Sequence, residues 1–238
     1  MLLKQYKKKM IHILNNAGGS EKLNSIKYEG SPNERDQRWM NKKHPLVTID
    51  WKEILPAPPK NTSEVTRLEL KEVERLTRSL SNEQFDLVMA VNDEPLHVFE
   101  PYLKRHSLHY PKELVDLALD NIYPIWLKLK YYHKRARPFQ IAPHFGSVIS
   151  VIQTSTHQTP AYPSGHQTEG ATIAEVLCSV YPEHKSSFHE ASALVGTARL
   201  LQGVHYPSDN EAGKRLAKIC WENVKENLDD KWTNLIKG

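Results

Sequence analysis

Residues 163–180 read PSGHQTEGATIAEVLCSV, a short polar loop that runs directly into an apolar stretch. The apolar side chains recur at helical spacing, at Ile173, Val176, Leu177 and Val180. This spacing predicts a helix that begins just after Ser164. Free backbone amides at a helix start point outward, the helix dipole favours an anion there, and Gly165 lets the backbone approach closely. The stretch therefore predicts a helix whose first turn can bind an anion.

Two further segments carry cationic and imidazole side chains. Residues 130–138 read KYYHKRARP, and residues 199–209 read RLLQGVHYPSD. Together with the PSGH run they supply one Lys, two Arg, two His, one Ser hydroxyl, a Gly amide and one Asp. Arg offers a planar fork to phosphate oxygens and Lys a point charge, while one imidazole can attack phosphorus and another can protonate a leaving group. The set suits a tetrahedral oxyanion such as phosphate.

The third segment also pairs an imidazole with a carboxylate, because Asp209 lies four residues after His205. A carboxylate at that distance can accept a hydrogen bond from one ring nitrogen and leave the other free to attack. Arg199 is expected at the edge of its helix, where it can reach over the core toward a neighbour. Lys134 and Arg135, inside the first segment, are expected to be solvated charges.

These three segments resemble the type 2 phosphatidic acid phosphatase and vanadium haloperoxidase superfamily, whose motifs read K-x6-RP, PSGH and SR-x5-H-x3-D. Spacing and order match in all three, over about a third of the chain, with Ala198 standing where the family usually has Ser. The resemblance implies that His205 is a nucleophile forming a phospho-histidine and that His166 is the acid, with Asp209 orienting the nucleophile. It also implies an oxyanion cradle made of Lys130, Arg137, Ser164, Gly165 and Arg199.

Within that superfamily, the Tyr-Tyr pair before Arg-x-Arg-Pro-Phe in residues 131–139 resembles the bacterial nonspecific acid phosphatases. This resemblance implies a soluble, metal-independent phosphatase that hydrolyses phosphomonoesters without a cofactor. One alternative is a vanadate-dependent haloperoxidase, because the same cradle holds vanadate and the run 161–166 is also like that branch. A second alternative is a non-catalytic phosphate-binding protein. No carboxylate cluster suited to a divalent ion is seen, so no metal site is predicted.

Composition narrows the classes of partner. A chain of 238 residues can form one sizeable domain, and its net charge of +4 is too mild to indicate a nucleic-acid partner. No segment approaches the roughly 20 apolar residues of a membrane span, and no apolar run typical of a secretory signal follows the first residues. We therefore expect a cytoplasmic protein with a small phosphorylated substrate, and we leave homo-oligomerisation open. The two cysteines, Cys178 and Cys220, are expected to be buried free thiols.

Apolar spacing along the rest of the chain predicts an all-α, single-domain helix bundle with its active site at helix ends and loops. Residues 1–61 are expected to form a basic N-terminal helix and an irregular arm packed on the domain, with a short strand at Leu46–Trp51. Residues 62–238 are expected to form the phosphatase-like helical domain. Its helices are expected at about 62–80, after Ser81, at 94–104, 111–133 and 144–153, after Ser164, from about Ser187 to Gly203, and from Pro207 onward.

Overall fold

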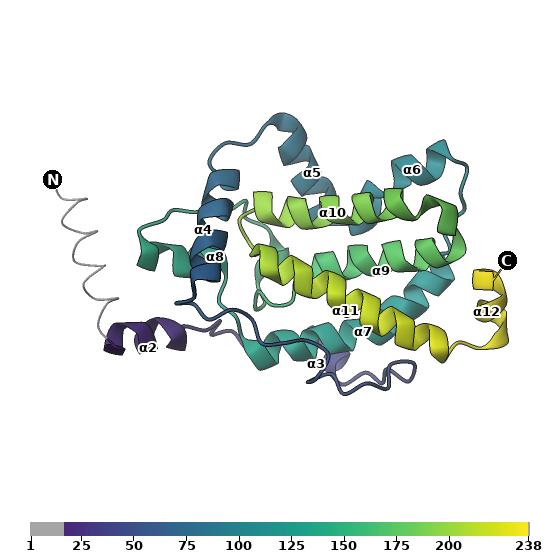
Figure 1. The fold of residues 1–238 in the computed structure, drawn as a ribbon, viewed down its shortest axis with the longest axis horizontal. Coiled ribbons are helices and arrows are strands. Elements are labelled where there is room, and N and C mark those ends of the chain that lie inside the picture. The colour runs from purple at the N-terminus through teal and green to yellow at the C-terminus, as the bar shows by residue number, and fades with distance from the viewer. Residues whose placement is uncertain (1–16, 238) are drawn as a thin grey trace.

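The computed structural model describes residues 17–237, and within that range every regular element is a helix and no strand is present. The predicted all-α fold is confirmed (Figure 1). The α-helices are α2 (Ala17–Ser25), α3 (Glu34–Met40), α4 (Glu64–Thr77), α5 (Asn82–Asp93), α6 (Glu100–Arg105), α7 (Lys112–His133), α8 (Pro138–Ile141), α9 (Gly165–Val180), α10 (Lys185–Leu201), α11 (Pro207–Glu226) and α12 (Asp230–Lys237). Short 3-10 helices lie at η1 (Pro95–Val98), η2 (Ala142–Phe145), η3 (Ser155–His157) and η4 (Pro182–His184). The helix expected near the N-terminus lies outside the described residues.

Helices α7, α9, α10 and α11 form the centre of the bundle, with α9 packed against the other three. The predicted apolar face of α7 is completely buried, at Leu114, Ala118, Ile122, Ile125 and Leu129. The arm contributes to the same core through Val47, Ile54 and Leu55. The bundle is thus held by burial of apolar faces, while the boundary between arm and domain at residue 61 stays a prediction.

The bundle brings one set of helix ends together, toward the left of Figure 1. There α7 and α10 end, and α9 and α11 begin. Ser164 caps α9 by accepting a hydrogen bond from the Gln167 amide at 3.4 Å. Gly203, at φ +80°, supplies the left-handed turn after α10, so the chain can reverse into α11. Both the predicted start of α9 and the predicted stop near Gly203 are confirmed.

The strand predicted at Leu46–Trp51 is wrong. These residues form turns and extended backbone, and their amides bind side chains of the bundle. The Leu46 amide donates to Asn121 Oδ1 of α7 at 3.0 Å, and the Thr48 amide donates to Asn223 Oδ1 of α11 at 2.7 Å. Because these backbone donors are satisfied without a partner strand, no sheet forms.

Two predicted helices have the wrong extent. The helix expected at 144–153 is only the 3-10 turn η2, because Gly146 at φ +68° ends it and extended backbone follows. The helix expected at 94–104 is divided into η1 and α6. Pro95 lies in the first turn of η1 and Pro101 in the first turn of α6. Proline is tolerated there because a first-turn amide has no intrahelical hydrogen-bond acceptor.

Several short helices were not predicted, among them α3, α8 and α12, and one cysteine differs from expectation. Helix α3 is capped by Asn33, which accepts from the Asp36 amide at 2.8 Å, and its Trp39 packs on Tyr123 of α7. Helix α12 follows α11 at the C-terminal end. Cys220 is buried as expected, but Cys178 is only half-buried, because its side of α9 lies near the surface.

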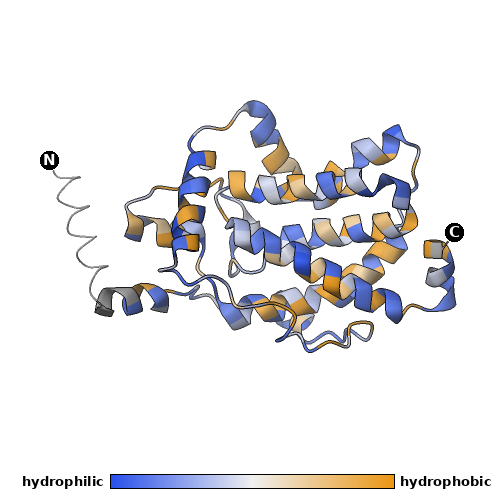
Figure 2. Ribbon diagram, viewed as in Figure 1, coloured by the Kyte–Doolittle hydropathy of each residue, from blue (hydrophilic) through white to orange (hydrophobic). Residues whose placement is uncertain are grey.

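The described helices mix polar and apolar residues along their length (Figure 2). Within residues 17–237, no helix is both long enough and apolar enough to cross a membrane.

Close approach of α9 and α11 depends on Gly213. A Cβ at this position would lie 2.9 Å from the Ser164 carbonyl oxygen and 3.1 Å from the Thr168 amide nitrogen. Both are backbone atoms of the start of α9, so they cannot move aside independently. The first turn of α9 is therefore fixed relative to α11 by the absence of a side chain at this glycine.

We expect Gly213→Ala to lower the free energy of unfolding by about 1–3 kcal/mol, because the overpacking outweighs the better helix propensity of Ala. Urea unfolding followed by circular dichroism measures this change. Lys218→Ala, at an exposed position of the same helix, is the control and should leave the midpoint nearly unchanged. A Gly213→Ala variant as stable as the parent would show that the two helices can separate without cost.

Candidate active site

The site residues predicted from the sequence come together where the helix ends meet. They are contributed by five separate elements, and none of them belongs to the middle of a helix. Lys130 lies in the last turn of α7, Arg137 caps α8, Ser164 caps α9, Gly165 and His166 open α9, Arg199 lies in the last turn of α10, His205 lies in the loop before α11, and Asp209 lies in the first turn of α11.

Three cations of this group are buried. Lys130, Arg137 and Arg199 are 4%, 1% and 1% exposed. The loop from 154 to 163 supplies oxygen partners for all three. Lys130 Nζ donates to the Pro160 carbonyl at 2.6 Å, Arg137 Nε to the Thr159 carbonyl at 2.9 Å, and Arg199 Nη2 to Thr156 Oγ1 at 3.2 Å. The cations are therefore held in fixed positions by neutral oxygens, which do not cancel their charge.

The electrostatics reflect this crowding of like charge. Burial and the charge of Arg137 hold the pKa of Lys130 well below its usual range. Burial lowers the pKa of Arg137 to about 10, and burial together with Arg137 lowers that of Arg199 to about 9. The buried Nε and Nη1 of Arg199 have no hydrogen-bond acceptor among residues 17–237. An anion placed among these groups would accept hydrogen bonds and relieve the repulsion.

His205 has a defined tautomer. Its Nδ1 lies 3.2 Å from Asp209 Oδ2, and its Nε2 lies 2.9 Å from Arg137 Nη1. Because a carboxylate only accepts and a guanidinium only donates, the proton is on Nδ1 and the lone pair of Nε2 faces the cations. Burial and the charge of Arg137 keep the pKa of His205 well below its usual range. The imidazole is thus neutral, and its unprotonated Nε2 faces Arg137.

Asp209 is kept ionised by its neighbours. Burial alone would raise the pKa of its carboxyl, but the charge of Arg135 and the hydrogen bond to His205 outweigh this effect and lower the pKa below its usual range. Arg135 Nη1 donates to Asp209 Oδ1 at 2.6 Å. Arg135 is only 4% exposed, so the prediction that it is a solvated charge is wrong. It is buried because a carboxylate pair, Asp209 and Glu69, surrounds its guanidinium.

His166 and Gly165 lie on the more accessible side of the group, and both are half-buried. Burial and the charges of Arg199 and Lys130 lower the pKa of His166, opposed by a hydrogen bond to the Asn92 backbone. A Cβ on Gly165 would lie 3.6 Å from Lys130 Cε, so the glycine is next to the buried amine. A substrate whose charged end contacts the cations would therefore extend toward solvent past His166.

Other residues of the site were not found from the sequence. Thr159 and Pro160 act through backbone carbonyls, for which residue identity carries little signal. Glu69 lies 66 residues before Arg135 in the chain. Arg135 itself belongs to the Arg-x-Arg-Pro run, and this repeated arginine was the one signal that could have identified it.

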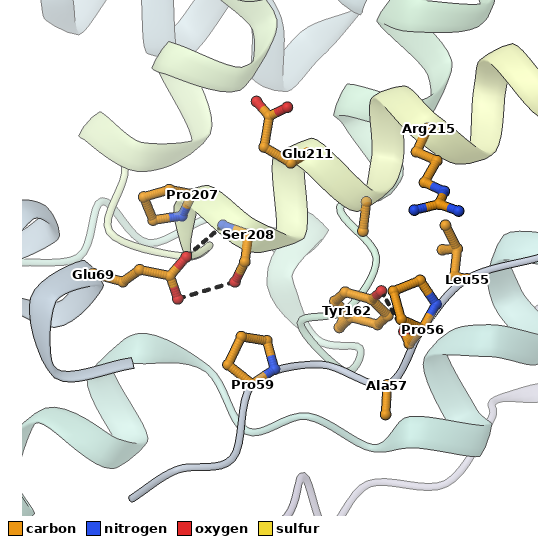
Figure 3. A pocket seen from close by; sticks show the side chains of 11 residues that line it. Leu55, Pro56, Ala57, Pro59, Glu69, Tyr162, Pro207, Ser208, Glu211 and Arg215 are labelled. Carbon is orange, nitrogen blue, oxygen red and sulfur yellow. Dashed lines mark hydrogen bonds between the residues drawn. The ribbon is translucent and has the colours of Figure 1, made fainter. Parts of the chain in front are cut away.

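A pocket of ≈ 470 Å³ lies at the start of α11, where Pro207 and Ser208 line it (Figure 3). Its wall is mainly apolar and includes Pro56, Pro59 and Tyr162. Glu69 and Ser208 line it as well and hydrogen-bond each other across it. Its lining includes no residue of the predicted cradle. Among residues 17–237, no group of three or more His, Cys, Asp or Glu side chains is arranged to hold a metal ion.

Several known proteins are similar to part of this chain. Residues 114–221 match the family model of the PAP2 superfamily. An acid phosphatase of Zymomonas mobilis is 37% identical over 57 residues, which are 24% of this chain and 22% of that protein. A non-specific acid phosphatase of Salmonella typhimurium is 29% identical over 90 residues, 38% of this chain and 36% of that protein.

A lipid A 1-phosphatase of Rhizobium johnstonii is 32% identical over 88 residues, 37% of this chain and 34% of that protein. The matches thus span about a third or less of the length of these curated relatives. A solved transmembrane PAP2 type phosphatidylglycerolphosphate phosphatase from Bacillus subtilis aligns over 96% of each chain at 16% identity, but its TM-score of 0.38 is too low to show a shared fold. The three motifs all lie inside the segment that matches the family model. Over residues 114–221, somewhat less than half of its length, this chain therefore resembles the PAP2 superfamily.

Proposed function

We propose that this protein is a phosphatase that hydrolyses phosphomonoesters through a phospho-histidine on His205. The observation that supports it most is the group of three buried cations, one of which, Arg137, contacts the unprotonated Nε2 of a neutral imidazole. Fixed cations around a nucleophile suit phosphoryl transfer, in which catalysis is mainly positioning and charge stabilisation. A binding protein would need the cations but not a histidine with its tautomer set by a buried carboxylate. That pairing favours turnover over the non-catalytic alternative.

In the first step, Arg137 shifts its hydrogen bond from His205 Nε2 to a phosphoryl oxygen, and the freed lone pair of Nε2 attacks phosphorus while the bond from phosphorus to the ester oxygen breaks. Lys130, Arg137, Arg199 and the first amides of α9 stabilise the charge on the equatorial oxygens. The Nδ1 proton stays with the imidazole, and Asp209 stabilises the positive charge that develops on the ring. In the second step, water attacks the phospho-histidine, and phosphate and free His205 result.

His166 supplies the proton that the leaving oxygen requires. In the free protein its pKa is lowered by burial and by Arg199 and Lys130. A bound phosphoryl group brings negative charge beside these cations, which raises the pKa of His166 and favours the protonated form at the moment it is needed. After the alcohol departs, the neutral ring can take a proton from the attacking water.

The substrate is proposed to be a small phosphate monoester with its organic group on the accessible side of His166. The curated relatives act on chemically different phosphates, by their names an acid phosphatase and a lipid A 1-phosphatase. Because the cradle contacts only the phosphoryl group, the residues outside it decide which alcohol is accepted. A cytoplasmic location and any self-association stay predictions.

The two histidines should respond differently to substitution. We expect His205→Ala to abolish the covalent intermediate and lower kcat by roughly 10³-fold or more on every substrate. We expect His166→Ala to cost about 10²–10⁴-fold on alkyl phosphates but far less on an activated aryl phosphate, which needs little protonation. Steady-state kinetics on both substrate types and acid-quench trapping of labelled phosphoprotein measure these effects. His144→Ala, at an exposed position, is the control; equal losses on both leaving groups would contradict the separate roles.

Orthovanadate should inhibit competitively, with an inhibition constant well below the KM of the substrate. It can adopt a trigonal-bipyramidal geometry with His205 at an apex, and transition-state analogues bind far tighter than substrates. Arg199→Ala should weaken this inhibition strongly, because its unpaired donors face the equatorial oxygens. Arg105→Ala, an exposed arginine at the end of α6, should not. Bromide oxidation by the vanadate-loaded protein with peroxide, without ester hydrolysis, would replace the phosphatase assignment by the haloperoxidase one.

We expect phosphatase activity to survive excess EDTA. The positive charge at the site comes from side chains, and three buried cations would repel a divalent ion from the same position. Activity is measured on an aryl phosphate before and after dialysis against the chelator. Complete loss that magnesium or zinc restores would contradict a metal-independent mechanism.

A further inference from the structure

Arg135 connects three groups behind the proposed nucleophile. Its Nη1 donates to Asp209 Oδ1 at 2.6 Å and to Ser208 Oγ at 2.8 Å, and its Nη2 donates to Glu69 Oε2 at 3.2 Å. The guanidinium also stacks 3.8 Å from the ring centroid of Tyr206. Arg135 follows α7 directly, so it joins the end of that helix to the start of α11. None of these contacts involves the cradle.

Glu69 completes the arrangement from α4, a helix outside the segment that matches the family model. Its Oε1 accepts from the Ser208 amide at 2.6 Å, and its Oε2 accepts from Ser208 Oγ at 2.9 Å. Figure 3 shows this carboxylate reaching across the pocket to the first turn of α11. Glu69 therefore fixes both Arg135 and the backbone one residue before Asp209.

The two oxygens of Asp209 have different partners. Arg135 occupies Oδ1, while Oδ2 accepts from the Tyr206 amide at 2.9 Å and faces His205 Nδ1 at 3.2 Å. With both oxygens engaged, the carboxylate cannot rotate about its χ2 without breaking a charged hydrogen bond. The side chains of Arg135, Glu69 and Asp209 are 2%, 9% and 0% exposed, so each broken contact would leave a buried charge unpaired.

We propose that Glu69 and Arg135 form a clamp that positions Asp209 and thereby holds His205 in its nucleophilic tautomer. The inference rests on the proposed function, because it assigns a role to residues behind the proposed nucleophile. Glu69 and Arg135 are positioning residues, since they touch neither the cradle nor the phosphoryl site. Without the clamp, Asp209 can turn away from Nδ1, and the proton of His205 can move to Nε2, where it blocks attack on phosphorus.

The clamp also controls the ionisation of Asp209. The charge of Arg135 is the main influence that lowers the pKa of this carboxyl against the effect of burial. Loss of Arg135 therefore raises the pKa of Asp209. As the pH is lowered, activity then begins to fall at a higher pH than in the parent protein. The other charged or titratable groups that face Asp209 are Lys130, Arg137, His205, Tyr206, Tyr162 and Glu69.

The test compares three variants with the parent protein. Arg135→Met removes both the charge and the planar guanidinium donors, whereas Arg135→Lys keeps the charge but not those donors. Glu69→Gln keeps the shape of the side chain and one acceptor oxygen. Arg215→Met is the matched control, because Arg215 is an exposed arginine of α11 that lines the same pocket (Figure 3). The readings are kcat and KM against pH on an aryl phosphate, orthovanadate affinity, and the tautomer of His205 from NMR of ¹⁵N-histidine-labelled protein, assigned with His205→Asn.

We expect Arg135→Met to lower kcat by roughly 10²-fold or more while KM and vanadate affinity change by less than about threefold. The acid limb of its kcat–pH profile, where kcat falls as the pH is lowered, should move to higher pH. The Nε2–H form of His205 should appear in the NMR spectrum. Arg135→Lys should keep the acid limb near that of the parent with an intermediate kcat. Glu69→Gln should lower kcat by a smaller factor, and Arg215→Met should match the parent.

A parental kcat, acid limb and tautomer in Arg135→Met would overturn the clamp. A fall in kcat accompanied by an equal loss of vanadate affinity would also overturn it, because that pattern indicates general structural damage. If Arg135→Met does not fold, the same readings on Arg135→Lys and Glu69→Gln decide. If the parent hydrolyses no phosphate ester, the proposed function fails, while the His205 tautomer in the variants still tests the clamp.

Discussion

Burial of like charge at the meeting point of helix ends is the constraint on which the rest of this structure depends. Lys130, Arg137 and Arg199 come from three different elements and are almost completely removed from water. Each buried ion costs several kcal/mol of solvation even after relaxation. The protein offsets part of this cost with the carbonyl and hydroxyl oxygens of the loop 154–163. An anion bound among the cations would offset more of it, which is the physical basis of the proposed phosphate site.

A second layer of charge balances the first. The Asp209 carboxylate contacts His205, and its own charge is balanced by Arg135. Arg135 is balanced in turn by Glu69, so positive and negative groups alternate from the cradle to α4. Such a network is stable only when every member is paired, because the low dielectric of the interior penalises an unpaired group heavily. The positions of α4 and α11 are therefore coupled to the chemistry of the site.

The errors of the sequence-based prediction have a common cause. The strand at Leu46–Trp51 and the helix at 144–153 were inferred from local patterns, whereas both segments bind partners distant in the chain. Asn121 and Asn223 bind amides of the first segment, and Gln202 exchanges hydrogen bonds with the Ile152 backbone in the second. Arg135 was predicted to be solvated because charged residues are usually exposed. Its burial is possible because Glu69 and Asp209, which lie far from it in sequence, offset the desolvation cost of its charge. By contrast, the helices with apolar faces and serine caps were predicted well, since spacing and capping are local properties.

The sequence by itself determined the helical class, the start of α9 at Ser164 and the stop at Gly203, because these depend on periodicity and capping. The eight site residues taken from its short motifs stay a prediction. Tertiary structure alone decided that the three cations are buried and that the proton of His205 lies on Nδ1. It also decided that Glu69 of α4 reaches Arg135 and Ser208. The physical reason is that burial, electrostatic coupling and hydrogen-bond partners depend on distances in space, which the order of residues along the chain does not specify.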